Sequence, residues 1–305
     1  MKIAIMGTGG MGGYIGGRLA HAGREVVFIA RGEHLSAIKK RGLRIESPSG
    51  DFEIKPAHAT DCPEEIGEVD LILFCVKAYD AIEAANFIKP MIGPNTAILP
   101  VLNGVDHIKW LIDLCGSEHV LGGVAVIIAN IREPGVIKHS GFNSLVFGEL
   151  AGGVSNRCEK IQQILAVDEI EAKAVPDILG QMWWKFGSMC GVGGVFAVMR
   201  GDKERIFGFE ETRSLIRQAI TEVVRVAQAK GYPLSNSVPN DILSGISNAP
   251  PHYKPSILVD LDKGNRLEIE ALNGALSRYG KEVGVPTPIN DFIYACLKPY
   301  ANGTL

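Results

Sequence analysis

The sequence lacks the features that would place the protein in a membrane, on nucleic acid or around a metal ion. No apolar run approaches the ~18 residues of a membrane-spanning helix. The net charge is only −3, which excludes a general electrostatic attraction to nucleic acid or anionic lipid. The six cysteines contain no CxxC pair and no metal-ligand spacing. These absences predict a cytoplasmic protein with reduced thiols, a small-molecule ligand and no metal, in which any anion site is local.

The sequence contains enough apolar residues to form the cores of two domains. It has 305 residues, 46% of them hydrophobic, which is typical of a packed globular protein. In the first half, short apolar runs alternate with helix-like segments, a pattern that predicts βαβ units and a parallel sheet covered on both faces. After Pro176 the periodicity becomes helical. We therefore predict an α/β domain over residues 1–175 and an all-helical domain over residues 176–305.

The expected elements follow from the same patterns. Buried parallel strands are predicted at residues 2–6, 25–30, 70–76 and 97–100, and a last strand at 170–175. A hairpin is predicted from residues 43–46 and 52–55, and a three-stranded meander from residues 122–130, 136–139 and 144–147. Apolar stripes predict one helix through residues 215–227 and another through residues 267–276.

A glycine-rich motif lies directly after the first strand and before a helix. It matches GxGxxG and consists of Gly7, Thr8, Gly9, Gly10, Met11 and Gly12. The first glycine allows a tight turn, the second lets the backbone approach a pyrophosphate, and the third permits close helix–strand packing. The helix N-terminus supplies N–H donors to the phosphates. A glycine-rich turn without a ligand is the alternative, but the βαβ context favours a Rossmann-type dinucleotide-binding domain.

The residue that follows the second strand bears on the choice of dinucleotide. An NAD site usually has an acidic residue there, which binds the ribose 2′-hydroxyl. Here the residue is Arg31, and a guanidinium pairs well with a 2′-phosphate. We therefore predict that the cofactor is NADP, with NADPH as its reduced form. Two alternatives stay open, because Glu33 could serve an NAD ribose and Arg31 could be a solvated surface residue.

Several motifs together carry a resemblance to a known family. They are the glycine motif at residues 7–12, Val76-Lys77-Ala78, Leu102-Asn103-Gly104, Trp184-Lys185-Phe186 and the segment 265–274. In order and spacing the chain resembles the ketopantoate reductases along nearly its whole length. The resemblance implies NADPH-dependent reduction of 2-dehydropantoate (ketopantoate) to pantoate, a step of pantothenate and coenzyme A biosynthesis.

The resemblance also implies roles for single residues. Lys77 and Asn103 would lie by the cofactor, and Asn103 would in addition contact the substrate. Lys185 would be the catalytic lysine, and Ser256 would help to hold the substrate carboxylate. Glu268 would bind the substrate hydroxyl and complete the catalytic pair with Lys185.

The chemistry of Lys185 agrees with that role. Reduction of a ketone needs a hydride at carbon and a proton at oxygen, and a nearby ammonium group can supply the proton. Lys185 lies in the apolar segment 182–187, where its pKa should fall toward neutrality. Plainer interpretations are a snorkelling Lys185, a Glu268 on a charged helix face and an Asn103 in a simple Asn-Gly turn.

Two positions depart from the family pattern and leave the substrate open. The family has asparagines four and eight residues after the catalytic lysine, on one helix face with it. Here these substrate-contacting positions are Met189 and Gly193, whose side chains cannot make the same hydrogen bonds. Ser188 or Asn273 could restore the contacts, or the substrate could be another apolar or branched 2-oxo acid. A non-catalytic NADP-binding regulatory protein is the alternative of another class, and a homodimer is compatible with the sequence.

Overall fold

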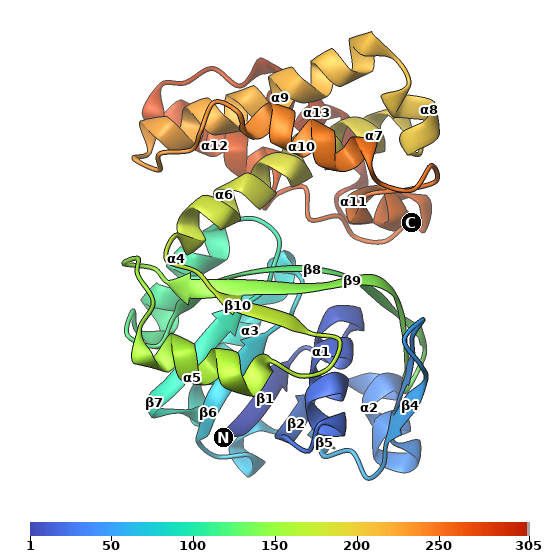
Figure 1. Cartoon of the computed structure of the whole chain (residues 1–305), viewed down its shortest axis with the longest axis vertical. Coiled ribbons are helices and arrows are strands. Elements are labelled where there is room, and N and C mark those ends of the chain that lie inside the picture. Colours follow the sequence, from blue (N-terminus) through green and yellow to red (C-terminus); the bar gives the residue numbers. More distant parts are fainter. Residues whose placement is uncertain (304–305) are drawn as a thin grey trace. The chain divides into compact units, whose positions relative to one another are not determined.

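The computed structural model describes residues 1–303, and these form two compact units (Figure 1). The first unit contains residues 1–102 and 107–178. The second contains the chain from Leu179 onward together with the short segment Asn103–Asp106. Within the described residues no helix is long and apolar enough to cross a membrane.

The first unit is built on a parallel sheet, as predicted. Its strand order is β5-β2-β1-β6-β7, and every pairing is parallel. The strands are β1 (Lys2–Met6), β2 (Glu25–Ile29), β5 (Ala59–Thr60), β6 (Val69–Phe74) and β7 (Ile92–Pro100). Ile3, Ile5, Leu71 and Leu73 are fully buried, as expected for strands with both faces covered. β7 begins five residues before the predicted strand, because Thr96 bonds to Val69 and Gly93 and so joins a polar segment to the sheet.

Helices alternate with the strands of the first unit along the chain (Figure 1). They are α1 (Gly10–His21), α2 (Gly32–Arg41), α3 (Ala81–Phe87), α4 (Asp106–Cys115) and α5 (Asn156–Leu165), with short 3-10 turns η1 (Pro63–Glu65), η2 (Ala78–Asp80) and η3 (Lys89–Met91). α1 begins four residues after β1 ends, so the glycine motif spans the turn between a strand and a helix. The predicted α/β class is confirmed.

The second sheet of this unit confirms one sequence-based prediction and contradicts another. It consists of β3 (Leu43–Glu46), β4 (Phe52–Ile54), β8 (Leu121–Glu133), β9 (Val136–Glu149) and β10 (Glu171–Ala174). β3 and β4 form the predicted antiparallel hairpin. The predicted meander is wrong, because β9 runs on through Gly141 as a single strand paired with β8. The positive φ of Phe142 and a shift of register beside Gly141 absorb the irregularity that suggested a turn.

The second unit is helical (Figure 1). Its elements are α6 (Ile178–Ser188), the π-helix η4 (Met189–Gly193), α7 (Gly194–Met199), α8 (Lys203–Phe207), α9 (Glu210–Ala229), α10 (Val238–Ser247), α11 (Ser256–Asp262), α12 (Asn273–Val283), α13 (Pro288–Leu297) and η5 (Lys298–Tyr300). The predicted helix through residues 215–227 is α9, and Ile216, Ile220 and Val223 on its apolar stripe are fully buried.

The predicted helix through residues 267–276 is wrong in its first half. Residues 267–268 have no regular secondary structure, residues 269–272 form a turn, and α12 begins only at Asn273. The N–H of Ala271 donates to the carbonyl of Glu268, and the N–H of Gly274 donates to that of Ile269. Leu267, Ile269 and Leu272 are buried in the helical core, so their spacing reflects packing of a turn and not one face of a helix.

Candidate active site

The glycine motif borders a cavity of about 460 Å³ in the first unit. The cavity lies at the carboxyl ends of β1, β2 and β6, which is where parallel α/β sheets bind ligands. It collects part of the predicted cofactor set, namely Gly7, Thr8, Gly9, Arg31 and Lys77. Thr8 sets the turn beside β2, because its N–H and its hydroxyl both donate to the carbonyl of Ile29, at 3.0 and 2.9 Å.

The other residues of the motif, Gly10, Met11 and Gly12, lie outside this lining. A Cβ atom at Gly10 would be 2.1 Å from the carbonyl oxygen of Ala129, and one at Gly12 would be 2.2 Å from that of Gly7. These two glycines therefore permit close packing of the turn. A Cβ at Gly9 would meet nothing within 4 Å, so open space borders the backbone there. Open backbone before a helix N-terminus fits the diphosphate of a dinucleotide.

Arg31 presents its positive charge at this cavity. It precedes α2 as an extended N-cap residue, and its side chain is 82% exposed. One guanidinium nitrogen lies 3.5 Å from a carboxylate oxygen of Asp80, which also lines the cavity. An ion pair this exposed is weak, so Arg31 can exchange its partner for a phosphate. Asp80 is not among the residues predicted from the sequence, although it follows the Val76-Lys77-Ala78 motif at the same edge of the sheet.

Two further lining residues, His34 and Cys75, are uncharged. The N–H of Gly135 donates to Nδ1 of His34 at 3.1 Å, which places the ring proton on Nε2. The pKa of His34 is lowered by burial, although the nearby backbone of Thr8 acts to raise it. Burial raises the pKa of the Cys75 thiol to about 12, so the thiol stays protonated. The charge of the cavity therefore comes from Arg31, Lys77 and the acidic residues.

The second unit brings together Asn103, Lys185 and Glu268. The amide nitrogen of Asn103 donates to Oε2 of Glu268 at 3.0 Å, across 165 positions of sequence. Glu268 is only 7% exposed and lies in the turn before α12, not on a charged helix face. Lys185 lies half-buried on α6. Burial lowers the pKa of Lys185 to about 8, although the negative charge of Glu268 acts to raise it.

Met189 and Gly193 begin and end the π-helix that follows Lys185. In an α-helix, positions four apart drift by about 40° around the axis. A π-helix has more residues per turn, so the rotation from residue 189 to residue 193 differs less from a full turn. Residue 193 therefore lies closer to the helix face that carries Lys185 and Met189. A Cβ at Gly193 would lie 3.3 Å from Ile257, next to Ser256, the exposed first residue of α11.

Asn273 cannot stand in for the missing asparagines. Its side chain is fully buried. Its amide nitrogen donates to the carbonyl of Cys190 at 3.1 Å and to the side chain of Asn290 at 2.8 Å. Asn273 thus supports the π-helix from the core. Ser188 is partly exposed and stays a candidate for a compensating contact.

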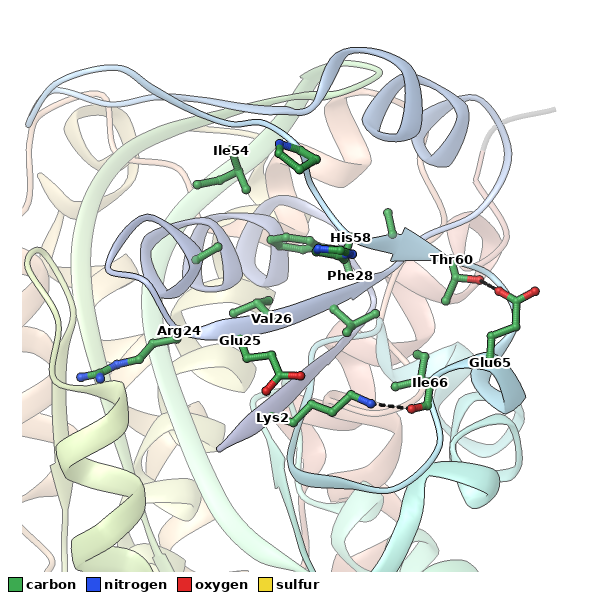
Figure 2. A pocket seen from close by; sticks show the side chains of 14 residues that line it. Lys2, Arg24, Glu25, Val26, Phe28, Ile54, His58, Thr60, Glu65 and Ile66 are labelled. Carbon is green, nitrogen blue, oxygen red and sulfur yellow. Dashed lines mark hydrogen bonds between the residues drawn. The ribbon is translucent and has the colours of Figure 1, made fainter.

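A second cavity of the first unit, of about 570 Å³, lies at the amino ends of β1 and β2 and beside β5 (Figure 2). Two hydrogen bonds join residues of its lining. Thr60 donates to Glu65 at 3.0 Å, and Lys2 donates to the carbonyl of Ile66 at 2.5 Å (Figure 2). Its lining contains none of the predicted site residues.

Comparisons with known proteins connect both units to one family. Residues 3–152 match the model described as ketopantoate reductase PanE/ApbA, and residues 177–301 match the model of its C-terminal part. A 2-dehydropantoate 2-reductase of Mesorhizobium japonicum is 29% identical, with 99% of this chain and 98% of that protein covered. YkpB of Bacillus subtilis, an uncharacterized oxidoreductase, is also 29% identical, with 98% and 99% covered.

Solved structures extend the likeness to the whole chain. A PanE/ApbA family ketopantoate reductase from Ralstonia eutropha has a TM-score of 0.90 at 31% identity, with 99% of this chain and 98% of that chain covered. A D-mandelate dehydrogenase, solved with NADH and anilino(oxo)acetate, has a TM-score of 0.91 at 26% identity, with 99% and 98% covered.

Proposed function

Because this chain belongs to the ketopantoate reductase PanE/ApbA family, whose members are oxidoreductases acting on CH–OH groups, we propose that it reduces a 2-oxo acid with NADPH. The observation that carries the proposal is the cluster of Asn103, Lys185 and Glu268, in which a half-buried lysine has a pKa of about 8. Our first candidate reaction is the reduction of 2-dehydropantoate to pantoate in pantothenate biosynthesis.

The residues of the first cavity fit a nicotinamide dinucleotide. Gly7, Thr8 and Gly9 would hold its diphosphate at the start of α1, where open space borders the backbone of Gly9. Arg31 would bind the 2′-phosphate, and Lys77 would add a second positive charge at the same edge of the sheet. When bound, the reduced dinucleotide supplies the hydride.

Lys185 supplies the proton in this proposal. With a pKa of about 8 the ammonium group is protonated at neutral pH, yet it releases its proton more readily than an exposed lysine. As the carbonyl carbon accepts a hydride, the carbonyl oxygen takes the proton from Lys185 and becomes a hydroxyl. Glu268 accepts a hydrogen bond from a substrate hydroxyl, and Asn103 orients that carboxylate through its amide.

Ser256, Met189 and Gly193 would decide which acid is reduced. The hydroxyl of Ser256, at the first position of α11, would donate to the substrate carboxylate. Met189 and Gly193 offer apolar surface and space where the family pattern has hydrogen-bonding amides. The ligand of the related D-mandelate dehydrogenase is an oxoacetate with an aromatic substituent. This likeness supports our second candidate, the reduction of an apolar or branched 2-oxo acid.

The test is steady-state oxidation of NADPH and of NADH with a panel of 2-oxo acids. The panel contains ketopantoate, 2-oxoisovalerate and larger apolar members, and kcat/KM is compared across it. Turnover of any member supports the reductase, and the member with the largest kcat/KM identifies the substrate class. Binding of NADPH without turnover of any member would instead favour a regulatory protein and overturn the proposal.

A further inference from the structure

A four-residue segment that follows β7 belongs structurally to the helical unit. This segment, Asn103–Asp106, is hereafter the 103–106 loop. Gly104 has a φ of +85°, and a Cβ there would be 2.6 Å from the carbonyl oxygen of Ala271. Val105 packs against the core of the helical unit. The loop backbone therefore lies against the turn that carries Glu268, at a distance that excludes a side chain at residue 104.

The last residue of the loop, Asp106, is held on both carboxylate oxygens. A guanidinium nitrogen of Arg278 donates to Oδ2 at 2.7 Å, and the hydroxyl of Tyr279 donates to Oδ1. The side chain of Asp106 is 10% exposed. A carboxylate that is removed from water and bonded at both oxygens has a defined orientation.

Arg278 also holds the turn that carries Glu268. Both of its terminal nitrogens donate to the main-chain carbonyl of Glu270 at 3.3 Å. One side chain on α12 thus ties the 103–106 loop to the turn at residues 268–271. The segment with Asn103 and the segment with Glu268 therefore share an anchor, although 165 positions separate these residues in sequence.

Tyr279 is held by contacts with Trp183 on α6 and with Lys230 at the end of α9. Its ring centroid lies 6.0 Å from that of Trp183, two residues before Lys185, and Nζ of Lys230 lies 4.5 Å from its ring. Burial, and after it the hydrogen bond to Asp106, raise the pKa of Tyr279. Its hydroxyl therefore remains a donor at any pH at which the protein would be assayed.

We propose that Asp106, Arg278 and Tyr279 are positioning residues for the reduction. They hold the 103–106 loop on the turn at residues 268–271, and so keep the amide of Asn103 against the carboxylate of Glu268. The inference rests on the proposed function, because it assigns these residues to the geometry of that same cluster. Their effect on the substrate is transmitted through Asn103 and, by way of its amide, through Glu268.

A double-mutant cycle in kcat/KM separates this role from general stabilisation of the fold. We expect Asp106→Ala and Asn103→Ala each to lower kcat/KM by about tenfold or more. We expect the double variant to be no worse than Asn103→Ala alone, because Asp106 then has nothing left to position. A double variant whose loss is the product of the two single losses overturns the inference. Tyr279→Phe replaces Asp106→Ala in the cycle if the latter does not fold.

Tyr294→Phe is the matched control. The hydroxyl of Tyr294 donates to the side-chain carboxylate of Glu270 at 3.0 Å, so this tyrosine contacts the same turn without holding the loop. We expect Tyr279→Phe to lower kcat several-fold, Asp106→Asn to retain more activity than Asp106→Ala, and Tyr294→Phe to match the unmutated protein. Equal losses in the two tyrosine variants overturn the inference.

Hydrogen exchange tests the anchor without relying on turnover. Amides of the 103–106 loop should exchange faster in Asp106→Ala than in the unmutated protein, while those of β1 should not change. Unchanged exchange in the loop overturns the inference whatever the activity. A protein that reduces no 2-oxo acid but shows the faster exchange keeps the anchor and overturns the proposed function instead.

Discussion

The proposed cofactor cavity and the proposed catalytic cluster are built in opposite ways. The cavity is bordered by the backbone of three consecutive residues, Gly7 to Gly9, directly after a strand. The cluster consists of side chains from three distant segments, at Asn103, Lys185 and Glu268. Binding a diphosphate needs backbone N–H groups and space, which a local turn provides. Acid–base chemistry needs side chains in a particular environment, which only the packed chain provides.

The positively charged residues of the two regions also differ in how strongly they depend on their surroundings. Arg31 is 82% exposed and works as a fixed charge, whatever surrounds it. Lys185 has a pKa of about 8 because its surroundings remove water from it. We therefore expect the largest effects of substitution in the catalytic cluster.

Lys185→Ala should have the largest effect. We expect kcat to fall by about 10²–10⁴, because the proton donor acts in the transition state. The affinity for NADPH should be nearly unchanged, because the residues proposed to hold the diphosphate and the 2′-phosphate belong to the first unit. Steady-state assays and fluorescence titration measure the two quantities. Near-normal turnover would remove Lys185 from the mechanism.

Arg31→Ala tests the other region. A charge-assisted contact with a 2′-phosphate contributes ~1.5–3 kcal/mol, so NADPH affinity should fall by roughly 10- to 150-fold while NADH affinity stays constant. Asp80→Asn is the opposite control, since it frees Arg31 from its carboxylate partner and should tighten NADPH binding slightly. Equal affinities for NADPH and NADH in the unmutated protein would contradict the assignment.

Two neighbouring glycines separate cofactor contact from packing. A Cβ at Gly10 would be 2.1 Å from the carbonyl of Ala129, so Gly10→Ala should lower the free energy of unfolding by about 1–3 kcal/mol. A Cβ at Gly9 meets only open space, so Gly9→Ala should keep its stability but bind the dinucleotide more weakly. Denaturation of both variants measures the change in stability, and titration with the dinucleotide measures the change in affinity. A Gly9→Ala protein with unchanged affinity would show that this backbone does not face the diphosphate.

Met189→Asn sharpens the question of the substrate. One restored hydrogen bond contributes ~0.5–1.5 kcal/mol, so kcat/KM for ketopantoate should rise by about two- to tenfold. Gly193→Asn should gain less, because a Cβ there lies 3.3 Å from Ile257 and the side chain must displace it. If ketopantoate is already preferred by several orders of magnitude without these changes, another residue compensates for Met189 and Gly193.

The pH dependence of kcat should show the smallest and most specific change. In the proposed mechanism Lys185 donates its proton only in the charged form, so activity should be present below its pKa of about 8 and should be lost as the pH rises through that value. The charge of Glu268 raises this pKa. Glu268→Gln should therefore move the alkaline limb of the profile to lower pH, as well as reduce kcat. A shift to higher pH would contradict the assignment of the limb to Lys185.

The fold could be predicted wherever the residues of a single helix or strand show the apolar periodicity of that element. The parallel strands, the hairpin of β3 and β4 and the long helix α9 follow from runs and periods of apolar residues. The predictions failed where packing overrode such a pattern. β9 continues past Gly141 because its partner β8 continues beside it. Residues 269–272 form a turn, and α12 begins only at Asn273, whose side chain is bonded within the core.

The sequence by itself determined the class of the fold and the glycine turn with its neighbouring arginine. These features depend on residues close together in the chain, whose conformation is set by local sterics and by strand order. Tertiary structure alone decided that Asn103 meets Glu268 and that Asp106 is held by Arg278 and Tyr279. Each of these depends on contacts between segments that are distant in the sequence, and such contacts cannot be inferred from the spacing of residues along the chain.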